Sequence, residues 1–190
     1  MKNSKIELGV QTLVHEGRFL SYLHQEFTWI NWKVGNYEMI VRNKVNDIIA
    51  VLPVTSDNKV ILIKQFRIPL ARDVIEVPAG LGDKPNENPL AILDRELKEE
   101  VWYESDNVKF CFESPTSSGL TNETCKCYIA FDCKKVTEEL AHEQAEQIEV
   151  LEFDLDNIFE ELNKLSQQWF MIWSKVYWLL FYLDKLKKKW

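Results

Sequence analysis

The chain has 190 residues, of which 46% are hydrophobic and 12% aromatic, enough for a full core in one domain or in one domain with an extension. Its net charge is −7, and the sequence has no basic stripe of the kind that binds nucleic acid, so we expect no nucleic-acid partner. The four cysteines lack the paired C-x-x-C spacing of zinc sites, and no apolar signal segment follows the first residues. We therefore expect reduced thiols in a cytoplasmic protein.

The N-terminal part of the chain alternates apolar and polar residues over residues 27–33 and again over residues 37–41. A period of two residues indicates antiparallel strands, so we expect an N-terminal β segment over residues 1–45. Trp29 and Trp32 lie in this segment. Each of them can stack on a base or on a partner, or can lie in a hydrophobic core, and the sequence leaves both roles open.

A buried hairpin is expected next, because Val60–Ile63 is an unbroken apolar run typical of a strand covered on both faces. The pair Asp57–Asn58 predicts the turn that joins it to an earlier strand over Ile48–Val54. Two short segments follow the hairpin, with the sequences QFRIPL over residues 65–70 and VIEVPAG over residues 74–80.

Residues 88–101 predict a helix. Asn88 can cap its N-terminus, and Pro89 can occupy the first helical position, where the missing N–H is not needed. The helix would pack on a sheet through an apolar stripe formed by Leu90, Ile92, Leu93 and Leu97.

Three carboxylates, Glu96, Glu99 and Glu100, fall at positions i, i+3 and i+4 of this helix and so share one face. Like charges this close destabilise a helix by a few tenths of a kcal/mol per pair, about 0.2–0.5. A divalent cation bound against them would explain the cluster, and Mg²⁺ or Mn²⁺ suits hard oxygen ligands. We expect this acidic face to point away from the core. The alternative, which the glutamates alone would favour, is a solvated acidic stripe.

The stretch from Glu87 to Glu100 resembles the core of the Nudix box, in which a glutamate is followed after seven residues by Arg-Glu-apolar-any-Glu-Glu. The two ends depart from the usual pattern. Gly80 stands one residue further from Glu87 than the usual glycine, which suggests an insertion in the loop, and Trp102 replaces the closing glycine. All the carboxylates of the box are present.

The flanking segments resemble the ADP-ribose and nucleotide-sugar pyrophosphatase branch of the Nudix hydrolases. They are QFRxPL, ExPAG and the later stretch SPxSxGxTxE over residues 114–123. The resemblance runs over about residues 41–156. It implies an α+β fold, an α/β/α sandwich with a mixed central sheet, and a Nudix domain over residues 46–166. It also implies a homodimer, since the N-terminal β segment of this branch commonly exchanges with a partner subunit.

The resemblance implies Mg²⁺-dependent hydrolysis of the pyrophosphate bond of ADP-ribose or a related nucleoside diphosphate sugar. The products would be a nucleoside monophosphate and a sugar phosphate. A catalytically inactive ligand sensor or interaction module on the same fold is the alternative. Glu96, Glu99 and Glu100 would bind the metal together with the backbone carbonyl of Ala79, and Arg95 would pair with Glu87 to fix the loop against the helix.

The remaining expected site residues come from positions that match this branch. Arg67 would contact the diphosphate or the terminal ribose and Glu76 the base or a sugar hydroxyl, although pairing between the two across adjacent strands is the competing reading. Gly80, Glu123 and Trp32 complete the expected substrate contacts. The catalytic carboxylates would be Glu146, with Glu143 second, joined by Glu100 and Glu99. The segment around Glu143 and Glu146 could instead be a solvated acidic loop.

The C-terminal third predicts strands over residues 108–113, 124–132 and 148–153 and a helix over residues 156–165. An aromatic-rich helix is then expected within residues 167–190, packed on the domain or at the dimer interface. Its aromatic residues and basic end also fit a helix lying on a membrane surface, so that contact stays open.

Overall fold

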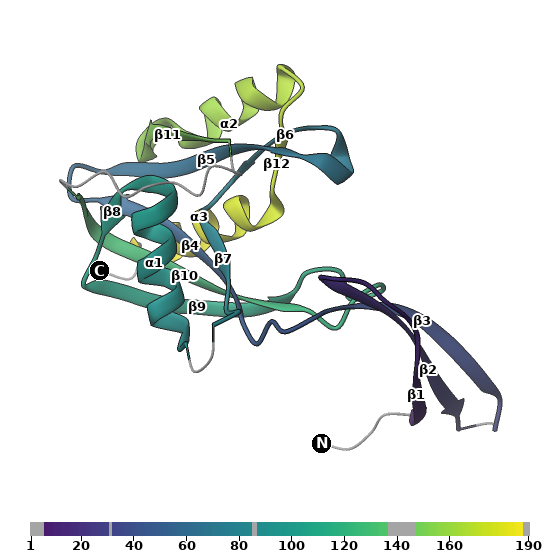
Figure 1. The fold of residues 1–190 in the computed structure, drawn as a ribbon. Coiled ribbons are helices and arrows are strands. Elements are labelled where there is room, and N and C mark those ends of the chain that lie inside the picture. The colour runs from purple at the N-terminus through teal and green to yellow at the C-terminus, as the bar shows by residue number, and fades with distance from the viewer. Residues whose placement is uncertain (1–5, 31, 85–86, 137–146, 188–190) are drawn as a thin grey trace.

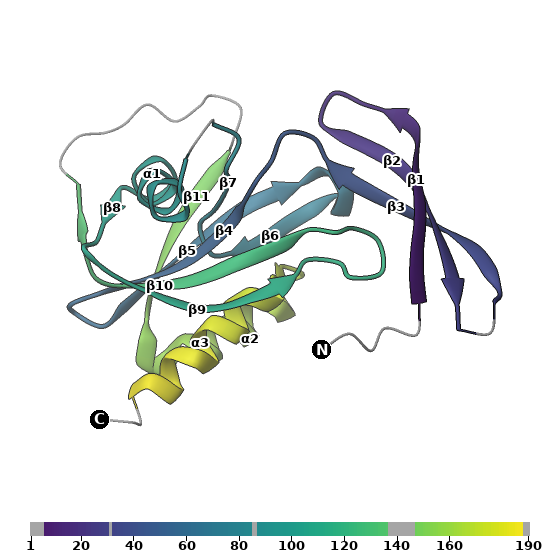
Figure 2. The ribbon, with the colours of Figure 1, turned by 90° about the horizontal axis from the view of Figure 1, so that it is seen from below.

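The computed structural model describes residues 6–30, 32–84, 87–136 and 147–187. Its main body has three layers, in which helix α1 (Pro89–Val101) covers one face of a sheet and helices α2 (Ile158–Gln167) and α3 (Ser174–Lys187) cover the other (Figures 1 and 2). The predicted α+β class with a mixed central sheet is confirmed.

Nine of the described strands form this sheet, in the order β12-β6-β5-β4-β10-β8, with β11 paired to β5, β7 to β4 and β9 to β10. The pairs β4–β10 and β6–β12 are parallel, and the other pairs are antiparallel. The strands are β4 (Ile48–Thr55), β5 (Lys59–Arg67), β6 (Arg72–Glu76), β7 (Ala79–Leu81), β8 (Tyr103–Glu104), β9 (Asn107–Pro115), β10 (Thr124–Lys135), β11 (Ile148–Asp154) and β12 (Met171–Ile172). Short 3₁₀ turns follow β5 and β11, over Ile68–Leu70 and Leu155–Asn157.

The central strand β5 shows why the sequence Val60–Ile63 has no polar residue. Val60 and Leu62 belong to the hydrophobic core beneath α2 and α3, whereas Ile61 and Ile63 belong to the core beneath α1. Successive side chains of a strand point to opposite faces, and helices cover both faces here. The predicted buried strand and the turn before it are confirmed.

The N-terminal strands β1 (Ile6–Glu16), β2 (Leu20–Trp29) and β3 (Val34–Arg42) form a separate antiparallel sheet. This N-terminal sheet projects from the side of the main body (Figures 1 and 2). Strand β3 of this sheet contacts the connection between β9 and β10. Arg42 pairs with Glu123 at 2.7 Å, and the Tyr37 hydroxyl donates to the carbonyl of Gly119 at 2.7 Å. The predicted antiparallel strands are confirmed.

The C-terminal helix is shorter than predicted. It begins at Ser174, because Trp169 adopts a left-handed backbone conformation (φ 73°) and Met171–Ile172 forms strand β12 beside β6. Pairing with the free edge of the sheet therefore overrides the apolar helical pattern of these residues. Within the described ranges, no helix combines the length and the hydropathy needed to cross a bilayer.

Candidate active site

The cleft that holds the acidic residues forms where two neighbouring strands separate. Strands β4 and β5 pair at Val54 and Val60 beside their turn, and further along β7 takes the place next to β4. Helix α1 crosses this region and contacts β4, β5 and β7. The result is a cleft of about 270 Å³, lined by Gln65, Arg67, Ala79, Gly80, Leu81, Asp83, Lys84, Arg95, Glu96, Glu99, Glu100 and Ile148.

Helix α1 begins as its sequence predicts. The side-chain oxygen of Asn88 accepts the backbone N–H groups of Leu90 and Ala91, each at 3.0 Å, and Pro89 is the first helical residue. Three residues of the predicted apolar stripe are buried, namely Ile92, Leu93 and Leu97, whereas Leu90 is exposed. This start fixes which residues of α1 face the cleft.

The acidic face of α1 points away from the hydrophobic core and lies over the Ala79–Gly80 segment that precedes the helix, as predicted, and the alternative of a solvated stripe fails for two of the three glutamates. Glu96 and Glu100 are only 8% and 7% exposed, because strand β7 lies against this face of the helix. The Glu100 carboxylate accepts the N–H of Ala79 at 3.0 Å, and Glu96 covers Gly80. Glu99 lies at the outer edge, with a side chain 45% exposed.

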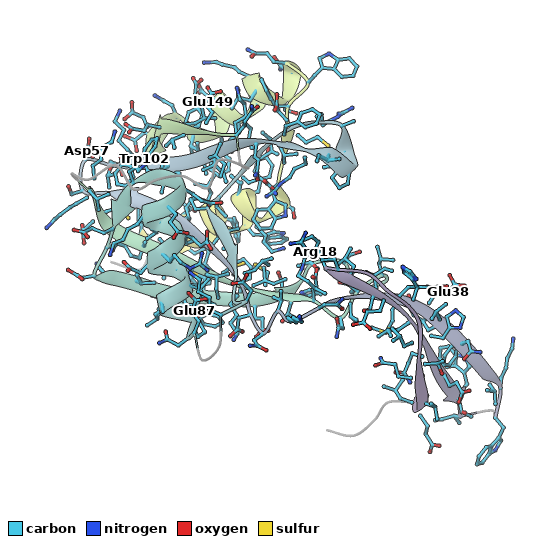
Figure 3. The ribbon with its side chains drawn as sticks, viewed as in Figure 1. Arg18, Glu38, Asp57, Glu87, Trp102 and Glu149 are labelled. Carbon is cyan, nitrogen blue, oxygen red and sulfur yellow. The ribbon has the colours of Figure 1, made fainter. Side chains whose placement is uncertain are left out.

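Arg95 connects the acidic residues to the loop before the helix. Its guanidinium pairs with Glu87 at 3.1 Å, Glu96 at 2.6 Å and Glu99 at 3.2 Å, and donates to the carbonyl of Leu81 at 3.2 Å. Burial opposes its charge, but the carboxylates outweigh this and raise the pKa of the guanidinium further above its ordinary value. The predicted Arg95–Glu87 pair is confirmed, and Figure 3 shows Glu87 beside the N-terminal end of α1.

The donor set has the chemistry of a site for a hard divalent cation. Three carboxylates of one helix border the cleft, and one oxygen of Glu87 is buried with no hydrogen-bond partner in the described part of the chain. Within that same part, no three acidic, histidine or cysteine side chains converge on one point, since Arg95 holds Glu96 and Glu99 and a backbone N–H holds Glu100.

Arg67 lines the cleft and forms an ion pair with Glu76, a residue of a neighbouring cavity of about 450 Å³, with 2.6 Å between Nη2 and the carboxylate. The alternative drawn from the sequence, that Arg67 and Glu76 pair across adjacent strands, thus describes their contact in this structure. Burial raises the pKa of the Glu76 carboxyl, and the charge of Arg67 opposes this shift. The Arg67 side chain is 40% exposed and lines the cleft, so it remains accessible to an anionic ligand.

Two of the predicted substrate contacts lie elsewhere in the same chain. Glu123 borders a separate cavity of about 180 Å³, where it pairs with Arg42. Trp32 is 83% exposed and lies in the connection between β2 and β3, at the end of the N-terminal sheet far from α1 (Figure 1). Glu143 and Glu146 fall outside the described residues, and Ile148, which follows Glu146 by two positions, lines the cleft.

Sequence reasoning missed three polar residues that line the cleft, Gln65, Asp83 and Lys84. Gln65 begins the QFRxPL segment and is two residues before Arg67 on the same strand, so the alternation of β5 could have placed both side chains on one face. Lys84 follows β7 in an irregular loop, and no periodic pattern marks it.

Comparison with known proteins supports this description. The model of the NUDIX domain family matches residues 45–172. The chain is 29% identical to the ADP-ribose pyrophosphatase of Bacillus subtilis (strain 168) over 157 residues, 83% of each chain. It is 25% identical to the ADP-sugar pyrophosphatase of Mus musculus over 180 residues, 88% of this chain and 82% of that protein.

Two further similarities are more limited. The chain is 29% identical to the methanol dehydrogenase activator of Bacillus methanolicus over 116 residues, which are 61% of this chain and 62% of that protein, less than two thirds of its length. The solved structure of an ADP compounds hydrolase superposes with a TM-score of 0.75 at 18% identity, covering 100% of this chain and 97% of the other, and shows a shared fold. Because the family model covers more than half of the chain, the chain belongs to the Nudix family.

Proposed function

We propose that this chain hydrolyses the pyrophosphate bond of ADP-ribose or a related nucleoside diphosphate sugar in an Mg²⁺-dependent reaction. The products are a nucleoside monophosphate and a sugar phosphate. The observation that carries the proposal is the cleft itself, which joins three glutamates of α1 to the accessible guanidinium of Arg67. Such a site offers oxygen ligands for a cation at one end and a cationic donor for phosphoryl oxygens at the other.

Glu96, Glu99 and Glu100, with the carbonyl of Ala79, are the proposed ligands of the metal. Bound Mg²⁺, or Mn²⁺, supplies charge neutralisation of the phosphoryl oxygens and lowers the pKa of a bound water. The protein residues position these groups. Arg95 fixes the orientation of Glu96 and Glu99 through its ion pairs, and the N–H of Ala79 orients Glu100.

The proposed general base is Glu146, with Glu143 as the second choice and a solvated acidic segment as the alternative. Support comes from the position of Ile148, which lines the cleft directly after this part of the sequence. Glu100 and Glu99 act as catalytic carboxylates through the metal. A carboxylate accepting a proton from the attacking water is the ordinary form of general-base catalysis.

Substrate contacts are proposed for Arg67, Glu76 and Gly80 in the cleft and its border. Arg67 binds the diphosphate, and release of its ion pair with Glu76 would free that carboxylate for a sugar hydroxyl or a base. Glu123 and Trp32 do not line this cleft within their own chain. A partner subunit that brings its N-terminal sheet to this cleft would be needed for Trp32 to stack on a base.

A homodimer formed through the N-terminal segment, residues 1–45, is part of this proposal. The described strands of that sheet expose the large apolar residues Leu8, Val10, Leu13, Val14 and Val34, and exposed apolar surface of this kind supports a protein–protein interface. A small isolated sheet is also marginally stable unless something covers it. Light scattering coupled to size exclusion tests this: a dimer that becomes monomeric in the double variant Leu8→Asp, Val10→Asp supports the proposal, and a monomeric wild type contradicts it.

The activity is tested by hydrolysis assays with ADP-ribose, GDP-mannose, ADP-glucose, UDP-glucose and a nucleoside triphosphate, each with Mg²⁺ and with EDTA. We expect metal-dependent cleavage of a diphosphate sugar that is lost in Glu100→Gln and retained in the control Glu104→Gln, which alters an exposed carboxylate on β8. No cleavage by folded protein that binds ADP-ribose tightly would favour the ligand-sensor alternative. Comparison of the hydrolysis rates of these substrates identifies the preferred nucleoside diphosphate sugar.

A further inference from the structure

A second cavity lies on the face of the sheet opposite α1, between strand β9 and the beginning of helix α3. Its volume is about 390 Å³, within the range of small-molecule sites. Its walls combine aromatic rings, hydroxyl groups and one ammonium group. The residues concerned are Phe112, Ser114, Thr116, Trp173, Lys175 and Trp178.

Lys175 is the unusual residue of this second cavity. It is only 5% exposed, and its ammonium lies 4.7 Å from the centroid of the Trp173 ring. No hydrogen bond or ion pair of this ammonium is found within the described chain, and it interacts electrostatically with the thiols of Cys125 and Cys127 as well as with the ring. A π face satisfies part of a positive charge but accepts none of the three N–H bonds directionally, so the ammonium keeps donors for a ligand that enters the cavity.

The sheet beneath this lysine supplies no negative charge. Phe112 and Ser114 of β9 are paired with Cys127 and Cys125 of β10, and both thiols are fully buried. Paired residues share one face of a sheet, whereas the intervening Glu113 points to the other face. The ammonium therefore borders a cavity surface made of rings, thiols and hydroxyls.

The helix start adds to this positive potential. Lys175 is the second residue of α3, a helix of 14 residues, and Ser174 before it lies at the border of the cavity as well. The first N–H groups of a helix have no partner within it and carry a partial positive charge. The Lys175 ammonium and the helix N-terminus thus favour an anion at the same place.

We propose that this second cavity binds a phosphate ester joined to an aromatic base, the chemistry of a nucleoside monophosphate. The phosphate accepts hydrogen bonds from Lys175 and from the hydroxyls of Ser114 and Thr116, and the base stacks on Trp178. The Trp178 ring is 61% exposed, which leaves a face free for stacking. The proposed contacts are all made by side chains of the protein, so we expect binding in the absence of divalent metal.

The second cavity adjoins the surroundings of the catalytic cleft. Trp173 and Ser174 also line a neighbouring cavity of about 450 Å³, whose other walls include Arg67 and Glu76. An occupant that shifts Trp173 would therefore change the environment of the proposed substrate-binding arginine. The binding itself does not depend on the proposed hydrolysis.

Calorimetric titration of the full-length protein with AMP, adenosine and inorganic phosphate, in EDTA, tests the proposal. We expect AMP to bind at least about 10-fold more tightly than either fragment, since a hydrogen-bonded charge and a stacked ring each contribute. Lys175→Met should weaken AMP binding about 10-fold and leave adenosine binding unchanged. Lys185→Met removes the same charge from an exposed position on the same helix and should change neither.

A second variant keeps the test decisive if Lys175→Met fails to fold. Trp178→Ala alters an exposed ring and should weaken the binding of both AMP and adenosine. Unchanged AMP affinity in Trp178→Ala, or in folded Lys175→Met, would overturn the proposal. Loss of metal-free AMP binding in Arg67→Ala with no change in Trp178→Ala would also overturn it, because the ligand would then occupy the catalytic cleft. Lack of hydrolytic activity would leave these outcomes unaffected.

Discussion

The side chain of Glu96 lies directly over Gly80, so that a Cβ atom on residue 80 would stand 1.9 Å from Oε1 of Glu96. Because residue 80 of β7 has no side chain, the nearly buried carboxylate of Glu96 can reach the cleft. In Gly80→Ala the glutamate must move. We expect kcat to fall about 100-fold, the size of effect that a displacement of about 1 Å produces in a catalytic group.

The control for this variant is Gly119→Ala, in which the nearest atom to the added methyl group is the Tyr37 hydroxyl at 3.8 Å. It should leave kcat unchanged. Steady-state kinetics with a diphosphate sugar and Mg²⁺ measure both variants, and circular dichroism checks that each is folded. A Gly80→Ala enzyme as active as the wild type would show that Glu96 is not positioned by this contact.

Local patterns predicted the part of the site that lies within one helix. Asn88 and Pro89 set the start of α1, and the spacing from Glu87 to Glu100 then fixed which side chains share a face. The burial of Glu96 and Glu100 depends on strand β7, which approaches from outside the helix. Helical periodicity alone therefore placed these side chains away from the core but did not distinguish a covered site from a solvated stripe. The sequence shows where Gly80 lies in the chain, but its contact with Glu96 forms only in the tertiary structure.

Long-range pairing explains the other differences. Glu123 belongs to a recognisable sequence segment, yet its partner Arg42 lies 81 residues away, and that pair holds it outside the cleft. The apolar residues before Ser174 fit a helix by composition, but Met171 and Ile172 pair with an edge strand. Propensity is a weak guide where an unpaired sheet edge offers backbone hydrogen bonds.

Trp102 ends helix α1 in the left-handed conformation (φ 60°, ψ 38°), at the position where the Nudix pattern has glycine. This conformation costs a residue with a Cβ atom about 1–2 kcal/mol. Trp102→Gly and Trp102→Ala both lose the ring, but only alanine keeps that cost. We therefore expect the glycine variant to be more stable than the alanine variant by about 1 kcal/mol in urea unfolding. Equal stabilities would contradict this explanation of the helix end.

The Glu76 carboxyl should give the stability of the protein a specific pH dependence. Burial raises its pKa in the folded state above the ordinary value of 4.5, so the folded state binds a proton more readily than the unfolded state. Its contribution to stability is present below the unfolded pKa and is lost as the pH rises through the folded pKa. The free energy of unfolding of the wild type should therefore fall relative to that of Glu76→Gln as the pH rises above the ordinary carboxyl pKa of 4.5. A constant difference across that rise in pH would contradict the prediction.

Arg95 should matter more for stability than any other cation of helix α1, because it neutralises carboxylates that are almost buried. The Glu87 and Glu96 side chains are 10% and 11% exposed, and Arg95→Met leaves both without their cation. We expect a loss of about 3–5 kcal/mol in the free energy of unfolding, as for other broken buried pairs. The control Lys98→Met removes an exposed pair with Asp94 on the same helix and should cost about 0–1 kcal/mol.

Urea unfolding with Mg²⁺ and with EDTA measures both variants. Since a cation bound to the acidic face replaces part of the missing charge, Mg²⁺ should stabilise Arg95→Met more than the wild type, and an equal effect on the two proteins would mean that the metal does not bind at these glutamates.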